Sequence, residues 1–294
     1  MKRKGNAAII LVVAFTALLG FTALALDIGN VYINKVKLSN ALDAAALSAC
    51  LELPENPSKA STIAYEYLEK NGIDPSRTTI SISDDNKQVE IEGDLDVKYF
   101  FAKAIGLKGT KVYAKTRAAI GPVKSVKGGL RPFAVVAYDF SYGDRVTLKE
   151  DAGDGYHGNY GVVALGGFGA NVFRINALYG YNGKISVGDL IDTEPGNMAG
   201  VVDDIRNYIN ADPYTFQNFK RDSRRLWTLP LVNTLEVDGR KKVLVVGFAE
   251  FFVEDVEKRS GKAEVTGRFI RYVRSGEIDF TLEDTGLYAA KLIR

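Results

Sequence analysis

The sequence is poor in the residues that most often build catalytic and metal centres. Its 294 residues include one cysteine, Cys50, and one histidine, His157. A single cysteine excludes a disulfide within the chain, and a single histidine excludes sites that need several imidazoles. With Lys2, Arg3 and Lys4 set aside, basic and acidic residues nearly balance, so the electrostatic basis of nucleic-acid binding is missing. We therefore expect no enzyme, no cofactor and no nucleic-acid partner.

Charge is also missing from a long N-terminal run, Ala7 to Leu26. At about 1.5 Å per residue, a helix of this length matches the roughly 30 Å hydrocarbon core of a bilayer. Basic residues lie before it, within residues 1–6, and Lys and Arg beside a span favour the cytoplasmic side. We predict a single-pass plasma-membrane protein, with residues 7–26 in the lipid bilayer, a cytoplasmic N-terminus and an extracytoplasmic bulk. A cleavable signal peptide is the alternative, because Ala23-Leu24-Ala25 fits a cleavage site.

The helical pattern continues outside the membrane, over residues 27–56, until Pro54 and Pro57 end it. Small and apolar residues recur at spacings of four and three, as in a heptad seam with one lysine, Lys35. We predict that this stretch is a helix interaction surface. Its residues are Ile28, Val31, Leu38, Asn40, Leu42, Asp43, Ala45 and Ala49. Asn40 and Asp43 would hydrogen-bond a partner helix. The alternative for these polar positions is plain exposure to solvent.

Residues 5–51 resemble the N-terminal segment of the TadE/TadG-like proteins of the Tad (tight adherence) Flp pilus-assembly family. The matching elements are Gly5, the apolar run, the motif ALALDIG at 23–29, Tyr32, and LSNALDAAAL at 38–47. Ser39 departs from the family, which usually has Gln there. The resemblance implies a bacterial cell-surface structural protein, a minor pilin-like or assembly component of a pilus or secretion apparatus. Its partners would be other pilus-assembly or pilin-like membrane proteins, or further copies of the chain.

The rest of the chain predicts an α+β fold. A small α+β unit is expected at 57–121, with a helix at 58–71, a hairpin at 78–83 and 88–97, a short helix at 98–107 and a strand at 110–120. Residues 122–129, rich in Gly, Lys and Ser, predict a linker. Residues 130–294 predict a mainly β extracytoplasmic domain. Its strands are expected at 132–138, 145–149, 160–165, 226–232, 242–253 and 263–273, with a helix at 198–209.

Two loops raise the question of a cation. Asp139-Phe140-Ser141-Tyr142-Gly143 resembles part of the metal-dependent adhesion site of von Willebrand A domains, but Gly143 stands where a second Ser is needed. A turn explains these residues equally well. The second loop contains Asp151 and Asp154, and a solvated loop is the simpler interpretation because the spacing differs from a calcium-binding EF-hand.

Other polar and glycine-rich groups have structural interpretations. A phosphate loop needs a strand, a loop and a helix, ending in Lys-Ser or Lys-Thr, and we do not expect these at Gly161–Gly169, where close backbone packing is the better account. The carboxylates at 203–204 and 254–257 are expected on solvated faces. Cys50 is expected as a half-buried helix residue, with a disulfide to another subunit as the alternative.

Two other classes of function remain open beside the structural one. The first is a membrane-anchored adhesin or binding module. The second is an anchored exterior hydrolase, which would need convergent carboxylates or a metal at Asp139 or at the loop of Asp151 and Asp154.

Overall fold

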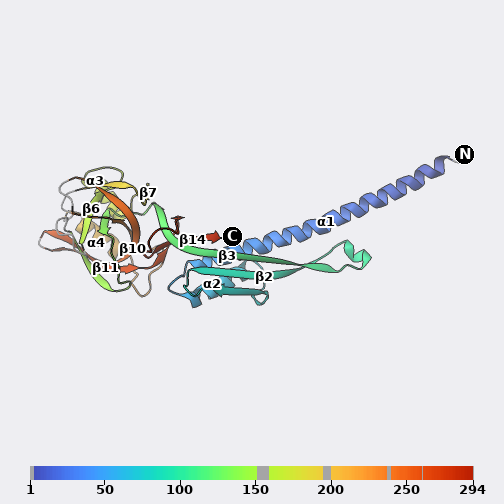
Figure 1. Cartoon of the computed structure of the whole chain (residues 1–294), viewed down its shortest axis with the longest axis horizontal. Helices are drawn as coiled ribbons and strands as arrows, with labels where there is room; N and C mark the ends of the chain where they lie inside the picture. The colour runs from blue at the N-terminus through green and yellow to red at the C-terminus, as the bar shows by residue number, and fades with distance from the viewer. Residues whose placement is uncertain (1–2, 151–158, 195–199, 237–239, 260, 294) are drawn as a thin grey trace. The chain divides into compact units, whose positions relative to one another are not determined.

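The computed structural model describes residues 3–150, 159–194, 200–236, 240–259 and 261–293. It has a long N-terminal helix followed by two β-sheets and several short helices, which confirms the predicted α+β class (Figure 1). The chain forms two compact units. The first contains the residues up to Ala119 and the C-terminal residues from Leu292, and the second contains Ile120–Lys291.

Helix α1, Arg3–Cys50, is continuous across the position where the sequence predicts the membrane boundary. Its apolar window has no buried side chain, and among the described residues α1 is the one helix long and apolar enough to cross a membrane. The hydroxyls of Thr16 and Thr22 donate to the carbonyls of Val12 and Leu18 at 2.8 and 2.9 Å. These two polar groups are therefore satisfied within the helix, as an apolar solvent requires.

The first unit packs the second half of α1 against a helix and a sheet. Helix α2, Pro57–Lys70, begins with proline in its first turn, where the missing N–H costs nothing. A short 3₁₀ helix, η1 (Pro75–Arg77), leads into β1 (Thr78–Ile82), β2 (Gln88–Lys98) and β3 (Gly109–Lys127), which pair in antiparallel order. Its core residues are Leu38, Ala41, Leu42, Ala45, Ala46 and Ala49 of α1, Ala60, Ala64 and Leu68 of α2, and Val89 and Ile91 of β2.

Three expected boundaries in this region differ from the structure. Helix α1 ends at Cys50, and residues 51–55 form turns instead of further helix. The helix expected at 98–107 is only a 3₁₀ turn, η2 (Ala102–Ile105), because Lys98 still pairs with Gly109 in the sheet and Gly106 stops the turn in the left-handed region (φ 89°). Residues 122–127, which the sequence assigns to a linker, belong to β3 and pair with β7 (Lys184–Ser186) and β13 (Glu277–Ile278).

The second unit is mainly β. Its large sheet runs in the order β11-β5-β6-β4-β9-β10-β8. These strands are β4 (Phe133–Val136), β5 (Arg145–Glu150), β6 (Asn159–Ala164), β8 (Leu190–Thr193), β9 (Leu226–Val232), β10 (Lys242–Arg259) and β11 (Lys262–Ile270). Strands β12 (Tyr272–Val273) and β14 (Leu287–Ile293) pair in parallel. The aromatic core includes Phe133, whose ring stacks on Trp227 at 5.0 Å and meets Tyr160 edge-on at 5.5 Å.

Two helices accompany this sheet. Helix α4, Val202–Asn210, covers most of the range expected at 198–209, of which residues 198 and 199 lie outside the described residues. Helix α3, Ala170–Tyr179, was not expected, because its start follows directly on the glycine-rich 161–169. Both helices bury apolar residues, among them Phe173 and Ile205, in the same core cluster as the sheet.

Candidate interaction helix

Asp27, the first charged residue after the apolar run, is tied to a loop far away in sequence. Its carboxylate is buried and accepts hydrogen bonds from the connection between β2 and β3. The Phe100 N–H donates to Oδ1 at 2.6 Å, and the Ala102 N–H donates to Oδ2 at 2.7 Å. The Phe101 N–H reaches both oxygens, at 3.3 and 3.1 Å. Asp27 therefore occupies the N-terminal end of η2, where free N–H groups favour an anion.

The charge state of Asp27 follows from these contacts. Desolvation raises the pKa of its carboxyl, but the N–H groups of 100–102 and the positive charge of Lys103 outweigh it, so the pKa lies below the ordinary aspartate value. Asp27 is therefore ionised at neutral pH and holds the loop as an anion.

The predicted interaction surface divides into a buried and an exposed part. Leu38, Leu42, Ala45 and Ala49 are buried inside the first unit, where α1 packs on α2 and β2. These four side chains are already covered by their own chain. A heptad pattern predicts that residues will be buried but does not indicate whether the same chain or a partner buries them. Their contribution to binding a partner stays a prediction.

The polar members of the predicted surface also separate. Asp43 accepts a hydrogen bond from the Thr116 hydroxyl of β3 at 2.5 Å, so one carboxylate oxygen serves the fold of the first unit. Asn40 is exposed, as the solvent alternative had it. Cys50 is fully buried and is a free thiol, and burial raises its pKa to about 12. A buried, protonated thiol is a poor partner for a disulfide to another subunit.

A second apolar face of α1 lies outside the first unit's core. Ile28, Tyr32 and Ile33 are largely exposed and Val36 is partly so, although all four follow Asp27 and stand beyond the uncharged run. At about 100° per residue, Ile28, Tyr32 and Val36 lie on one side of the helix, opposite the side that carries Asp27 and Leu38. The heptad pattern predicts Ile28 and the half-buried Val31 as members of an interaction surface. It does not include Tyr32, Ile33 and Val36, because these three positions do not follow the spacing of the seam.

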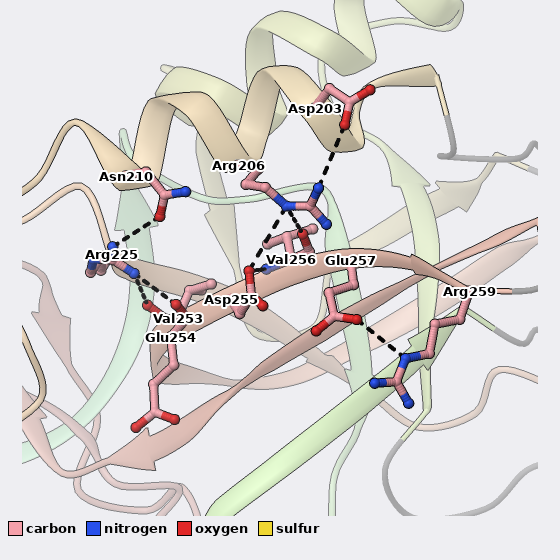
Figure 2. Close-up of polar contacts among 10 residues, drawn as sticks. All are labelled: Asp203, Arg206, Asn210, Arg225, Val253, Glu254, Asp255, Val256, Glu257 and Arg259. Atoms are coloured by element: carbon pink, nitrogen blue, oxygen red, sulfur yellow. Dashed lines mark hydrogen bonds and ion pairs between the residues drawn. The ribbon is translucent and has the colours of Figure 1, made fainter.

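The carboxylate clusters at 203–204 and 254–257, in the second unit, form ion pairs with arginines. Figure 2 shows Arg206 of α4 between Asp203 and Asp255, at 3.7 and 3.9 Å, while its Nε donates to the Val256 carbonyl at 2.8 Å. Glu257 pairs with Arg259 at 3.2 Å (Figure 2). The other two carboxylates also face arginines: Glu254 pairs with Arg145 and Arg268, and Asp204 with Arg174. Each of these carboxylates thus has a guanidinium group beside it, and such pairing suits a structural role.

The glycine-rich segment differs from the expectation in one respect. Strand β6, a loop and α3 do follow in the order that a phosphate loop needs, but the Lys-Ser or Lys-Thr ending is missing. At the N-terminus of α3 the Gly169 N–H donates to Glu194 at 2.6 Å, so a carboxylate already lies where an anion would bind. A Cβ on Gly161 would lie 2.6 Å from Leu235, which fits the predicted close packing.

Of the two loops considered for a cation, only the one that contains Asp139 lies among the described residues. Asp139 and Ser141 are exposed on a turn before β5, and Asp151 and Asp154 lie outside the described residues. In the part of the chain that the structure describes, no three His, Cys, Asp or Glu side chains are grouped as a metal ion would require.

The features that stand out are therefore a long apolar helix, exposed over its first half, and a β-hairpin of the first unit whose connecting loop is hydrogen-bonded to Asp27, where the apolar run ends. Comparison with protein families gives the class of that helix. The model of the Tad family, described as putative Flp pilus-assembly TadE/G-like, matches residues 5–51 and confirms the resemblance of this segment. No curated protein and no solved structure matches the chain.

Proposed function

We propose that the chain is a single-pass membrane-anchored, non-enzymatic component of a Tad/Flp-type pilus or of its assembly apparatus. One observation carries this proposal: the family match, residues 5–51, coincides with α1, whose apolar window has no cover from the rest of the chain. Such a helix needs a lipid or protein environment, because each exposed large apolar side chain forgoes about 1.5–3 kcal/mol of burial.

The orientation follows from charge. Lys2, Arg3 and Lys4 precede the run, and the first charge after it is Asp27. By the positive-inside rule the N-terminus is cytoplasmic and the chain from Asp27 onward lies outside. A non-enzymatic role is supported by the arginine pairing of the described carboxylate clusters.

The partner contact that we propose uses the exposed face of Ile28, Tyr32, Ile33 and Val36. The side chains are apolar and lie just outside the bilayer, and the neighbouring small residues Gly29 and Ala25 leave room for close approach. The occupant is a helix of the same kind, from another pilin-like membrane protein or a second copy of the chain, because the family match covers this part of α1.

Site-specific photocrosslinking in bacteria that naturally produce the protein tests this contact. A photoreactive amino acid at Tyr32 should give crosslinks to the N-terminal helix of another pilus-assembly protein or of a second copy. The matched control is Tyr113 on β3, because Tyr32 and Tyr113 are 68% and 66% exposed. Crosslinks from Tyr113 alone, or from neither position in an intact membrane-bound chain, would show that this face binds no partner helix.

The role in assembly is tested by removing the protein. Cells that lack it should lose surface pili and regain them with the unchanged chain or with Tyr113→Ala, but less well with Tyr32→Ala. Normal pili in the absence of the protein would exclude the proposed function whatever the crosslinks show.

A further inference from the structure

The connection between β2 and β3 carries apolar side chains that no part of its own unit covers. Residues 98–108 read KYFFAKAIGLK. Phe100, Phe101, Ile105 and Leu107 are exposed, Ile105 by 79% and Phe100 by 66%. Two aromatic rings and two aliphatic side chains on one short loop, interspersed with lysines, are unusual for a surface that only meets water.

The position of this loop along α1 follows from three contacts. Asp43 meets Thr116 in the middle of β3, Asn30 donates to the Lys98 carbonyl at the end of β2 at 3.1 Å, and Asp27 meets residues 100–102. Moving along the hairpin toward its tip is thus the same as moving along α1 toward the apolar run (Figure 1). The tip is the part of the hairpin nearest to that run.

The distance to the expected membrane surface is short. Asp27 directly follows Leu26, the last residue of the uncharged run, and its carboxylate lies 2.6 Å from the Phe100 nitrogen. The backbone of the loop is therefore held at the level where α1 leaves the hydrocarbon core. The side chains of Phe100, Phe101 and Ile105 need no rearrangement of the fold to reach the headgroup layer.

We propose that the loop 98–108 is a second membrane contact, which enters the outer interface of the same bilayer that α1 crosses. Phe, Ile and Leu side chains bury their apolar surface at the boundary between headgroups and acyl chains, and lysines beside them place their ammonium groups among the phosphates. The lysines are Lys98, Lys103 and Lys108, and their charge is complementary to anionic lipid headgroups. The loop does so as part of the folded hairpin, with Asp27 as the residue that positions it.

This proposal rests on the membrane span proposed above, and the experiment separates the two. The full chain is reconstituted into vesicles of phosphatidylcholine and phosphatidylglycerol, either without bromine or with a mixture of lipids that carry bromine at depths from the headgroup end to the middle of the bilayer. Tryptophan emission is quenched on contact with bromine. The single native tryptophan, Trp227, is buried in the second unit and supplies the background in the unchanged chain.

Three variants each add one tryptophan at an exposed position. Ile105→Trp probes the loop and Phe15→Trp probes the apolar run. Tyr113→Trp probes β3 four residues after its first residue, Gly109, which is about 13 Å along the strand from the end of the loop at about 3.3 Å per residue. We expect blue-shifted emission and loss of intensity in brominated vesicles for Ile105→Trp and Phe15→Trp, and no change for Tyr113→Trp.

Each other outcome overturns a defined part. If Phe15→Trp is quenched and Ile105→Trp is not, the helix enters the bilayer and the loop does not, so the loop proposal is wrong while the anchor stands. If neither is quenched, the span and the loop proposal fail together. If Tyr113→Trp is quenched as strongly as Ile105→Trp, the sheet lies on the membrane as a whole and the contact is not a property of the loop.

Discussion

The substitution Leu42→Ala tests whether the apolar stripe of α1 stabilises the core of the first unit or serves to bind a helix of another protein. Leu42 is fully buried on the side of α1 that faces α2 and β2. Replacing a buried leucine by alanine costs about 2–5 kcal/mol, depending on how far the surroundings collapse into the cavity. The buried residues that α1 and α2 contribute to this core include Ala41, Ala45, Ala60 and Ala64, which have no rotamers with which to fill a void. We therefore expect a loss of about 3 kcal/mol.

Hydrogen exchange followed by mass spectrometry, on the full chain in detergent micelles, measures this loss. A loss of about 3 kcal/mol should speed the slowest amides of α2 and β2 by about two orders of magnitude. Amides of β9 and β10, in the second unit, should be unchanged. The matched control is Ile33→Ala on the same helix, where the side chain is 66% exposed and the cost should stay below about 0.5 kcal/mol.

The reasoning fails if Leu42→Ala leaves exchange in α2 and β2 unchanged, or if Ile33→Ala accelerates it equally. The first result would mean that the seam of α1 does not hold the first unit together and is free to bind another helix. The second would mean that the exposed face of α1 is as important to the unit's stability as the buried seam.

Three further predictions concern ionisable groups. In Asp27→Asn the backbone amides of residues 100–102 should exchange faster than in the unchanged chain. Because the pKa of Asp27 is lowered in the folded state, the unchanged chain should protect these amides at neutral pH. It should lose that protection only as the pH falls below the ordinary aspartate value of 3.8. Cys50, whose burial raises its pKa to about 12, should resist maleimide until the first unit is unfolded by denaturant, and rapid labelling of the native chain would contradict its burial. Burial raises the pKa of Glu250 in the folded state. The folded chain is therefore most stable with Glu250 protonated, at low pH, and it loses stability as the pH rises through the folded-state pKa. Glu250→Gln should therefore gain thermal stability relative to the unchanged chain as the pH rises above the ordinary glutamate value of 4.5, and a difference that stays constant with pH would contradict the shift.

The parts of the fold that follow from local pattern were predictable. The apolar run and its seam indicate α1, and the alternation of apolar residues around Val89 and Ile91 indicates the hairpin of β1 and β2. The linker at 122–129 was inferred from its Gly, Lys and Ser content and the helix at 98–107 from its local sequence alone. The sheet partners of Lys98 and of residues 125–127 decide the structure there instead.

The candidate site was harder to predict because its key contacts join distant residues. Nothing near Asp27 in the sequence indicates that its carboxylate will bind backbone groups of residues 100–102. Likewise, periodicity marks Leu38 and Leu42 as residues that will be buried, yet only the tertiary structure shows that α2 and β2 bury them. The family resemblance, in contrast, was visible in the sequence because it resides in one continuous segment.

The attachment of Asp27 to the hairpin has a consequence for bilayers of different thickness. A helix whose apolar run is longer than the hydrocarbon core adjusts by tilting, by kinking or by thickening the bilayer locally. In this chain the exit point of α1 is fastened to a folded hairpin, and drawing Asp27 into the hydrocarbon would either break its hydrogen bonds or pull the loop's lysines in with it. The outer end of the proposed span, about 30 Å long, is therefore held at the membrane surface. In a thinner bilayer we expect the excess length to be taken up by tilting about that end.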